Sequence, residues 1–252
     1  MGDLADAGRA ATTRGHDGSA FAREQARRLE PNAGRRAGHE APRAAQSEVH
    51  GGLAYPGVAT TIVLARHGET DWNRERRFQG HADVPLNDAG RAQAAQLAAR
   101  LADEPFSSVY TSPLRRAAET AELVAARLGV EVRPHVALKE VDVGSWSGLS
   151  VQDVEARYPE EYARWLENRA SGWHDGETWE ELAARVVAGL HEIARGHPGE
   201  HVLAVTHGGP IRSARTVALG LSAHEIHPGM APLTNCATYR IAVRDGNLEA
   251  VD

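Results

Sequence analysis

From residue 60 onward, short runs of apolar residues alternate with longer segments in which apolar positions recur at helical spacing. The runs Thr61–Ala65 and His201–Thr206 are almost entirely apolar, which is typical of strands buried on both faces of a sheet. Shorter runs predict further strands at Phe106–Tyr110, Val130–Pro134 and Ala237–Val243. The intervening segments, punctuated by a cap at Asn87 and by Gly129 and Pro159, predict helices over residues 88–101, 113–128, 151–158, 161–169, 177–195 and 208–219.

Strands that alternate with helices predict an α/β fold, with a mostly parallel sheet flanked by helices on both faces. The two short helices before residue 177 predict a small helical cap, inserted at about residues 149–180. Ligands of such sheets bind at the carboxyl ends of the strands. We therefore expect the ligand-binding or catalytic residues at the carboxyl ends of the buried strands.

The first 57 residues differ from the rest of the chain. They are rich in Ala, Gly, Arg and His, and Phe21 and Tyr55 are their only aromatic residues. Such a segment buries too little apolar surface to offset the entropy of ordering it. We expect residues 1–57 to be a disordered extension, or the product of a start codon assigned too early, and residues 58–252 to form one domain.

Composition and charge exclude several classes of protein. The 252 residues carry a formal net charge of −6, which gives no reason to expect a nucleic acid as partner. No apolar run is long enough to span a membrane, and the N-terminus lacks the apolar core of a secretory signal. The one cysteine, Cys236, excludes a disulfide within the chain. We expect a cytoplasmic protein, and the choice between monomer and homodimer stays open.

Two predicted strands end in the same way. The first ends in Arg66-His67-Gly68, and the other ends in His207-Gly208-Gly209. A glycine at this place lets the backbone approach a ligand closely, and the N–H groups of the helix that follows His207 would point at an anion. Arg66 adds a donor geometry that suits phosphate.

A third candidate segment begins the predicted helix at residues 113–128. It places Arg115 and Arg116 in the first turn, where the helix dipole disfavours cations unless an anion is bound. The spacing predicts that Arg116 faces the end of the sheet while Arg115 faces water.

These segments belong to an ordered set of motifs by which the chain, from about Thr60 to its C-terminus, resembles the histidine phosphatase superfamily, which includes the cofactor-dependent phosphoglycerate mutases. The resemblance implies a phosphoglycerate mutase-like three-layer sandwich. The motifs that carry it are Arg66–Asn73, Arg77–Gly80, Leu86–Gly90, Ser112–Ala117, Leu138–Gly148 and His207–Gly209.

The resemblance also implies roles for single residues. It makes His67 the nucleophile that takes up a phosphoryl group and Glu140 the acid that protonates the leaving group. Neither a metal nor a cofactor is required. The phosphoryl group would be held by Arg66, Asn73, Arg116, His207 and Gly208, with Gln79 as a weaker candidate.

The predicted function is a phosphatase that acts on a small phosphorylated metabolite. Its alternatives are a cofactor-dependent phosphoglycerate mutase and a non-catalytic protein that binds a phosphorylated ligand. The segment between Glu140 and His207 is compact, which favours a phosphatase over a mutase. Two local alternatives stay open: Glu140 could pair with Lys139 at the surface, and the tryptophans of the cap could line the pocket or only pack over the core.

Overall fold

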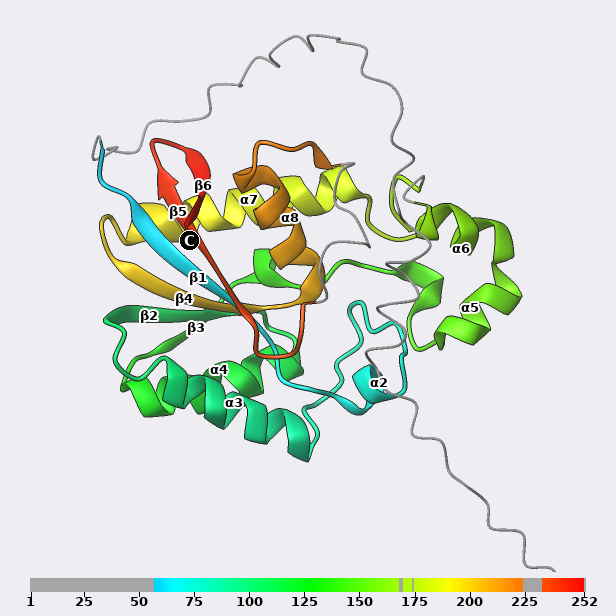
Figure 1. The fold of residues 1–252 in the computed structure, drawn as a ribbon, viewed down its shortest axis with the longest axis horizontal. Helices are drawn as coiled ribbons and strands as arrows, with labels where there is room; N and C mark the ends of the chain where they lie inside the picture. The colour runs from blue at the N-terminus through cyan, green and yellow to red at the C-terminus, as the bar shows by residue number, and fades with distance from the viewer. Residues whose placement is uncertain (1–56, 168–169, 174, 224–232, 252) are drawn as a thin grey trace, which may run out of the picture. The chain divides into compact units, whose positions relative to one another are not determined.

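The computed structural model describes residues 57–251 except 168–169, 174 and 224–232 (Figure 1). The predicted disordered extension at residues 1–57 therefore lies outside the described residues, apart from Gly57.

The centre of the structure is a six-stranded sheet in the order β3-β2-β4-β1-β5-β6. Strand β4 pairs in parallel with β1 and β2, and β2 pairs in parallel with β3. The β5 strand runs antiparallel to both β1 and β6. The bounds of the strands are β1 Thr60–Arg66, β2 Phe106–Thr111, β3 Val132–Pro134, β4 His201–Thr206, β5 Thr238–Arg244 and β6 Asn247–Val251.

The two central strands, β1 and β4, are buried on both faces, as their apolar runs predict. Successive side chains of a strand point to opposite faces of its sheet. Accordingly Ile62 and Leu64 join the core on one side, while Val63 and Ala65 join the core on the other side. The apolar runs thus reflect helices packed on both faces of the sheet.

One face is covered by α3 (Asp88–Arg100) and α4 (Arg115–Leu128), which pack against each other below the sheet in Figure 1. The predicted cap of α3 is present, because the side chain of Asn87 accepts a hydrogen bond from the Gly90 N–H at 2.8 Å. Helix α4 begins two residues later than predicted, since Leu114 is still extended. It ends at Gly129 in the left-handed conformation, where glycine is favoured.

The other face is covered by α7 (Trp179–Gly196) and α8 (Gly208–Ala218). The predicted start of α7 at Glu177 is two residues early, because Thr178 is the N-cap and accepts a hydrogen bond from the Glu181 N–H. The carboxylate of Glu181 accepts the Thr178 N–H in return, which makes a capping box.

The predicted cap at about residues 149–180 contains α5 (Val151–Arg157) and α6 (Pro159–Leu166), and η2 (Gly144–Trp146) precedes it. Pro159 does not break a helix but begins one, as suits a residue that lacks an N–H and has a fixed φ. An aromatic cluster fills the cap, in which Trp146 contacts Phe78, Tyr158, Tyr162 and Trp165. Two further short helices, α2 (Asp71–Arg74) and η1 (Val136–Leu138), lie in the loops that follow β1 and β3.

Strand β6 was not among the predicted elements. It forms a hairpin with β5 through Asp245 and Gly246, both at positive φ, as tight hairpin turns require. Leu248 is its only buried residue, so its sequence lacks the apolar run on which the other strand predictions depend.

Candidate active site

The carboxyl ends of β1 and β4 lie side by side, because these strands pair in parallel with Arg66 opposite Thr206. The histidines that follow them, His67 and His207, are both buried. Their rings are tilted by 58° with centroids 5.1 Å apart. The topology of the sheet thus brings together two residues that lie 140 positions apart in the sequence.

The ring of His67 is held in one orientation by its neighbour. Its Nδ1 lies 2.7 Å from the carbonyl oxygen of Gly68. A carbonyl only accepts hydrogen bonds, so in the neutral ring Nδ1 carries the proton and the lone pair is on Nε2. Burial, with the cations Arg116 and Arg66, holds the pKa of His67 well below its usual value. Both effects favour the form of imidazole that attacks an electrophile.

Position 68 has no room for a side chain, so it requires glycine. A Cβ there would lie 2.4 Å from the carbonyl oxygen of Gly90, at the start of α3. The backbone that comes close to Gly68 is therefore part of the protein, whereas the sequence led us to expect a ligand. The Gly68 N–H donates to Thr120 Oγ1 on α4 at 3.0 Å, which anchors the turn after His67.

The two arginines at the start of α4 point in opposite directions, as their spacing predicts. Arg115 is exposed and pairs with Glu119, with Nε 2.7 Å from Oε1. Arg116 is buried, and its guanidinium donates to the carbonyls of Ala82 at 2.7 Å and Gly80 at 2.8 Å. Burial lowers the pKa of Arg116 to about 10, so it remains a cation at neutral pH.

Arg66 lies at the end of β1 and donates through Nη1 to the carbonyl of Leu233. Burial and the nearby Arg212 lower its pKa to about 10. The Nε atoms of Arg66, Arg116 and Arg212 are buried and have no hydrogen-bond partner within the described part of the chain. Three guanidinium groups beside two neutral imidazoles form a cationic site, which favours an anionic ligand such as phosphate.

Asn73 and Gln79 are oriented by Thr70. The Oδ1 of Asn73 accepts the Thr70 N–H at 3.1 Å, and the Oε1 of Gln79 accepts the Thr70 hydroxyl at 3.0 Å. With both amide oxygens engaged, each side chain keeps its NH₂ group for another acceptor. Both residues line the pocket, where these donors are available to an anion.

Glu140 lines the same pocket as His67 and is bound by main-chain donors. Its Oε1 accepts the N–H groups of Val141 at 3.0 Å and Gly209 at 2.9 Å. A Cβ at position 209 would lie 2.5 Å from this oxygen, so the carboxylate has this place because residue 209 is glycine. The ion pair with Lys139 is not present, since the Lys139 Nζ instead lies 3.2 Å from His81 Nδ1.

A pocket of about 210 Å³ opens over these residues. Trp165, Trp173 and Trp179 form part of its wall, so the tryptophans of the cap both pack together and face the pocket. The other lining residues are Arg66, His67, Asn73, Arg77, Phe78, Gln79, Gly80, Glu140, Val141, Val143, Gly209 and Arg212.

Three of the candidate site residues do not line this pocket: Arg116, His207 and Gly208. His207 is fully buried, with its Nε2 2.8 Å from Ser112 Oγ and its Nδ1 unpartnered among the described residues. Of the helix N–H groups expected to meet an anion, that of Gly209 binds the protein's own Glu140. Arg116 and His207 thus lie beside His67 and deeper than the open pocket.

The sequence analysis gave no role to Arg212, to Asn235 or to Ser112, the first residue of the motif Ser112–Ala117. Arg212 lines the pocket from α8, and burial lowers its pKa. Asn235 donates through Nδ2 to the His67 carbonyl at 3.0 Å and to Asn73 Oδ1 at 3.3 Å. Only for Arg212 did the sequence offer a sign of a role in the site. Arg212 follows the motif at His207 by little more than one helical turn, and it stands between the apolar Ile211 and the small Ser213.

The low pKa of His67 predicts a measurable dependence of stability on pH. Between its folded value and the unfolded value of about 6.5, the unfolded chain binds a proton that the native state does not. Lowering the pH below about 6.5 should therefore destabilise the native state, by up to about 1.4 kcal/mol per pH unit for this group.

The variant His67→Gln lacks this group and should lose less stability in acid. We expect the difference in unfolding free energy between His67→Gln and the parent to shift in favour of the variant between about pH 6.5 and pH 5. Urea unfolding of both proteins across this interval measures the shift. Parallel pH profiles would mean that His67 has an ordinary pKa.

None of the helices in the described part of the chain could span a membrane. The same residues contain no group of three His, Cys, Asp or Glu side chains arranged to hold a metal ion.

Comparison with known proteins places this chain in a family. Phosphoglycerate mutase-like protein 4 of Arabidopsis thaliana is 46% identical over 158 residues, which are 60% of this chain and 68% of that protein. Phosphoserine phosphatase 1 of Hydrogenobacter thermophilus is 35% identical over 161 residues, covering 64% and 76% of the two chains. The structure of a mycobacterial glucosyl-3-phosphoglycerate phosphatase matches with a TM-score of 0.68 and 28% identity, over 76% of this chain and 95% of that one.

The family model described as histidine phosphatase superfamily (branch 1) matches residues 62–252, a range that contains both strand ends, the arginines and Glu140. With this match and the phosphatases among its relatives, the chain belongs to the histidine phosphatase superfamily, on its phosphatase branch.

Proposed function

We propose that the protein is a phosphomonoester phosphatase that forms a phosphohistidine on His67. The observation that carries this proposal is the oriented imidazole of His67. Its Nδ1 is bound to the Gly68 carbonyl, its ring lines the pocket beside Arg66, and Glu140 lines the same pocket. Nucleophile, phosphate-binding cations and an acid are the parts that this reaction needs.

In the first step, the Nε2 lone pair of His67 attacks phosphorus and the bond from phosphorus to the ester oxygen breaks. The leaving oxygen takes its proton from Glu140, because an alkoxide is a poor leaving group. Arg66 and Arg116 offset the charge on the other phosphoryl oxygens, and His207, which lies deeper than the open pocket, donates to one of them through Nδ1, the nitrogen that Ser112 does not engage. The products are the free alcohol, phosphohistidine and the Glu140 carboxylate.

In the second step, water attacks phosphorus and the bond to Nε2 breaks, which returns its electron pair to the ring. The Glu140 carboxylate takes the proton of the water, so the acid of the first step is the base of the second. The step releases inorganic phosphate and restores both neutral His67 and protonated Glu140.

The test is phosphate release with a chelator present and no divalent metal added, first from p-nitrophenyl phosphate and then from a panel of sugar phosphates and phosphorylated acids. We expect turnover of the aryl ester and of at least one metabolite. No release from any of them would refute the proposal. Isomerisation of 3-phosphoglycerate that requires a bisphosphate primer would identify a mutase in its place.

We further propose that the alcohol part of the substrate carries a second negative charge, as in a phosphorylated hydroxy acid. Two of the relatives are named for phosphoserine and glucosyl-3-phosphoglycerate, which both contain a carboxylate. Arg212 supports the same substrate class in this chain. It lines the pocket, and its Nε has no hydrogen-bond partner among the residues with described structure. When Glu140 is protonated as the acid, its charge no longer offsets that of Arg212.

Arg212→Met should therefore raise KM more for a substrate that carries a carboxylate than for one without it. A hydrogen bond to a charged group contributes about 1.5–3 kcal/mol, which corresponds to a factor of roughly 10–150. The measurement compares phosphoserine with phosphoethanolamine. Arg77→Met is the matched control, since Arg77 also lines the pocket but is held by Glu75 and the Gly148 carbonyl. Equal effects on both substrates would exclude Arg212 as the carboxylate-binding residue.

A further inference from the structure

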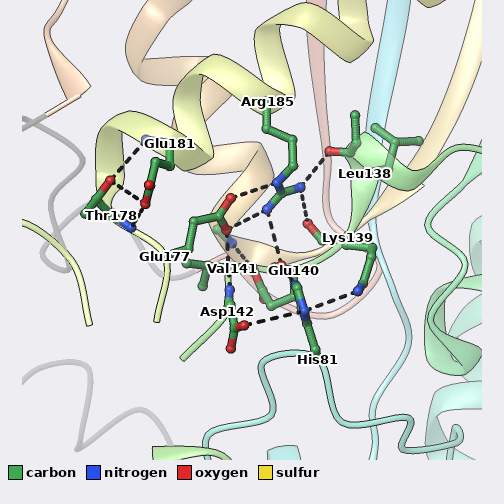
Figure 2. A network of polar contacts seen from close by, with 12 residues as sticks. His81, Leu138, Lys139, Glu140, Val141, Asp142, Glu177, Thr178, Glu181 and Arg185 are labelled. Atoms are coloured by element: carbon green, nitrogen blue, oxygen red, sulfur yellow. Dashed lines mark hydrogen bonds and ion pairs between the residues drawn. The ribbon is translucent and has the colours of Figure 1, made fainter. Parts of the chain in front are cut away.

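The main chain around Glu140 is bound by a residue of α7. Residues 139–143 form neither helix nor strand, so their carbonyl groups have no regular partners. Arg185 projects from α7 toward this segment, as Figure 2 shows. Its guanidinium lies within hydrogen-bond distance of several main-chain carbonyls in and next to this segment.

All five N–H donors of Arg185 are used. Two of its nitrogens bind Glu177, with Nε 2.8 Å from Oε1 and Nη2 2.7 Å from Oε2. The other three N–H groups donate to main-chain carbonyls. Both N–H groups of Nη1 are used, to Ala137 at 2.8 Å and to Lys139 at 3.0 Å, and the second N–H of Nη2 donates to Glu140 at 3.3 Å. A planar guanidinium with five fixed donors makes such an array, whereas a lysine could not.

A second donor reaches the same carbonyl of Glu140. The Nε2 of His81 lies 2.8 Å from this oxygen and must carry a proton to donate to it. Its Nδ1 then accepts a hydrogen bond from Lys139 Nζ at 3.2 Å (Figure 2). The carbonyl of Glu140 is thus held between an imidazole and a guanidinium.

Glu177 extends the array beyond Glu140. Its carboxylate accepts the Asp142 N–H at 3.3 Å, and its own N–H donates to the Asp142 carbonyl at 2.9 Å. The segment that carries Glu140 is therefore fixed on both sides, by Arg185 of α7 at residues 137–139 and by Glu177, which precedes α7, at Asp142. The pair of Glu177 and Arg185 is largely buried, with 14% and 25% of the side chains exposed.

We propose that Arg185, together with His81, is a positioning residue for the proton donor Glu140. This inference rests on the proposed function, because it assumes that Glu140 is the acid. A catalytic group must be held to within a fraction of an ångström, and a displacement of about 1 Å costs roughly 10²-fold in rate. The array holds the main chain of Glu140 on one side, while Val141 and Gly209 hold its carboxylate on the other.

The test uses the whole protein and two esters, p-nitrophenyl phosphate as a good leaving group and an alkyl phosphate as a poor one. For Arg185→Met we expect kcat/KM to fall roughly 10–100-fold for the alkyl ester and much less for the aryl ester. Arg185→Lys keeps the charge but not the fork, so it should show the same selectivity to a smaller extent.

A matched control separates positioning from general loss of stability. Arg240 also makes a bidentate pair, with Glu104 at 2.9 and 2.6 Å, and lies outside the pocket. Arg240→Met should leave the ratio of the two kcat/KM values unchanged, even if it lowers the unfolding temperature. If Arg185→Met does not fold, Arg185→Lys provides the comparison.

A double-mutant cycle with Glu140→Gln decides whether Arg185 acts through Glu140. Once the acid is gone, Arg185→Met should cause little further loss for the alkyl ester. Additive losses, or equal losses on both esters in the single variant, would overturn the positioning role. A Glu140→Gln variant without leaving-group selectivity would instead refute the acid assignment in the proposed function, so the two failures are distinguishable.

Discussion

Replacing His67 with alanine should abolish phosphate release from every ester that the protein hydrolyses, by about 10⁴-fold or more. No other described side chain combines the required features. The ring lines the pocket, its Nδ1 is bound to the Gly68 carbonyl, and its pKa is held low by burial and by Arg116 and Arg66. His207 is no substitute, because its Nε2 is engaged by Ser112 and it does not line the pocket. Steady-state release of phosphate measures the loss.

The control for this variant is His201→Asn. His201 is at the opposite end of β4 from His207 and does not line the pocket, so its replacement should leave kcat within a few-fold of the parent. Circular dichroism and thermal unfolding would establish that His67→Ala retains its fold. A folded His67→Ala variant with substantial turnover would mean that another group is the nucleophile.

Glu140→Gln should slow phosphoryl transfer from alkyl esters by about 10²–10⁴-fold and from p-nitrophenyl phosphate by far less. The amide oxygen of glutamine keeps the hydrogen bonds from Val141 and Gly209, so the fold should be preserved. What is lost is the proton, which only a poor leaving group needs. The comparison uses kcat/KM, because this constant reports the steps up to phosphohistidine and not its later hydrolysis.

The same variant should accumulate phosphohistidine with the aryl ester, since Glu140 is also the base for the attacking water. A burst of p-nitrophenol followed by slow turnover would reveal this. Glu131→Gln, at an exposed position directly before the edge strand β3, is the control for removal of a carboxylate. Equal slowing of alkyl and aryl esters in Glu140→Gln would remove Glu140 from the acid role.

The sequence predicted those elements of the fold that are marked by a local apolar pattern or by a capping residue. Strands β1 and β4 are recognisable because helices cover both of their faces, which demands unbroken apolar runs. The ends of α3 and α4 follow from Asn87 and Gly129, whose preferences are local. Strand β6 could not be found in this way, because it lies at the edge of the sheet with one buried residue.

Site residues could be predicted where a sequence motif identifies them. They could not be predicted where a residue has its role only through a tertiary contact. His67 and His207 are marked by their places at strand ends. The hydrogen bond from Gly209 to Glu140 joins residues 69 positions apart, and nothing in the local sequence announces it. Arg185 looks like any other arginine of an amphipathic helix, and Arg212 is marked only by its nearness to the motif at His207. The contacts of α7 and α8 show that Arg212 lines the pocket and that Arg185 binds the segment of Glu140.

The central claim is that the phosphoryl group passes through His67, and trapping the intermediate tests it most directly. The Glu140→Gln variant is mixed with p-nitrophenyl phosphate, quenched in alkaline denaturant, where phosphohistidine survives, and mapped by peptide mass spectrometry. We predict one phosphorylated residue, His67, whose label disappears when the quenched sample is acidified. A phosphoryl group on any other residue, or turnover with no labelled His67 at any reaction time, would contradict the account.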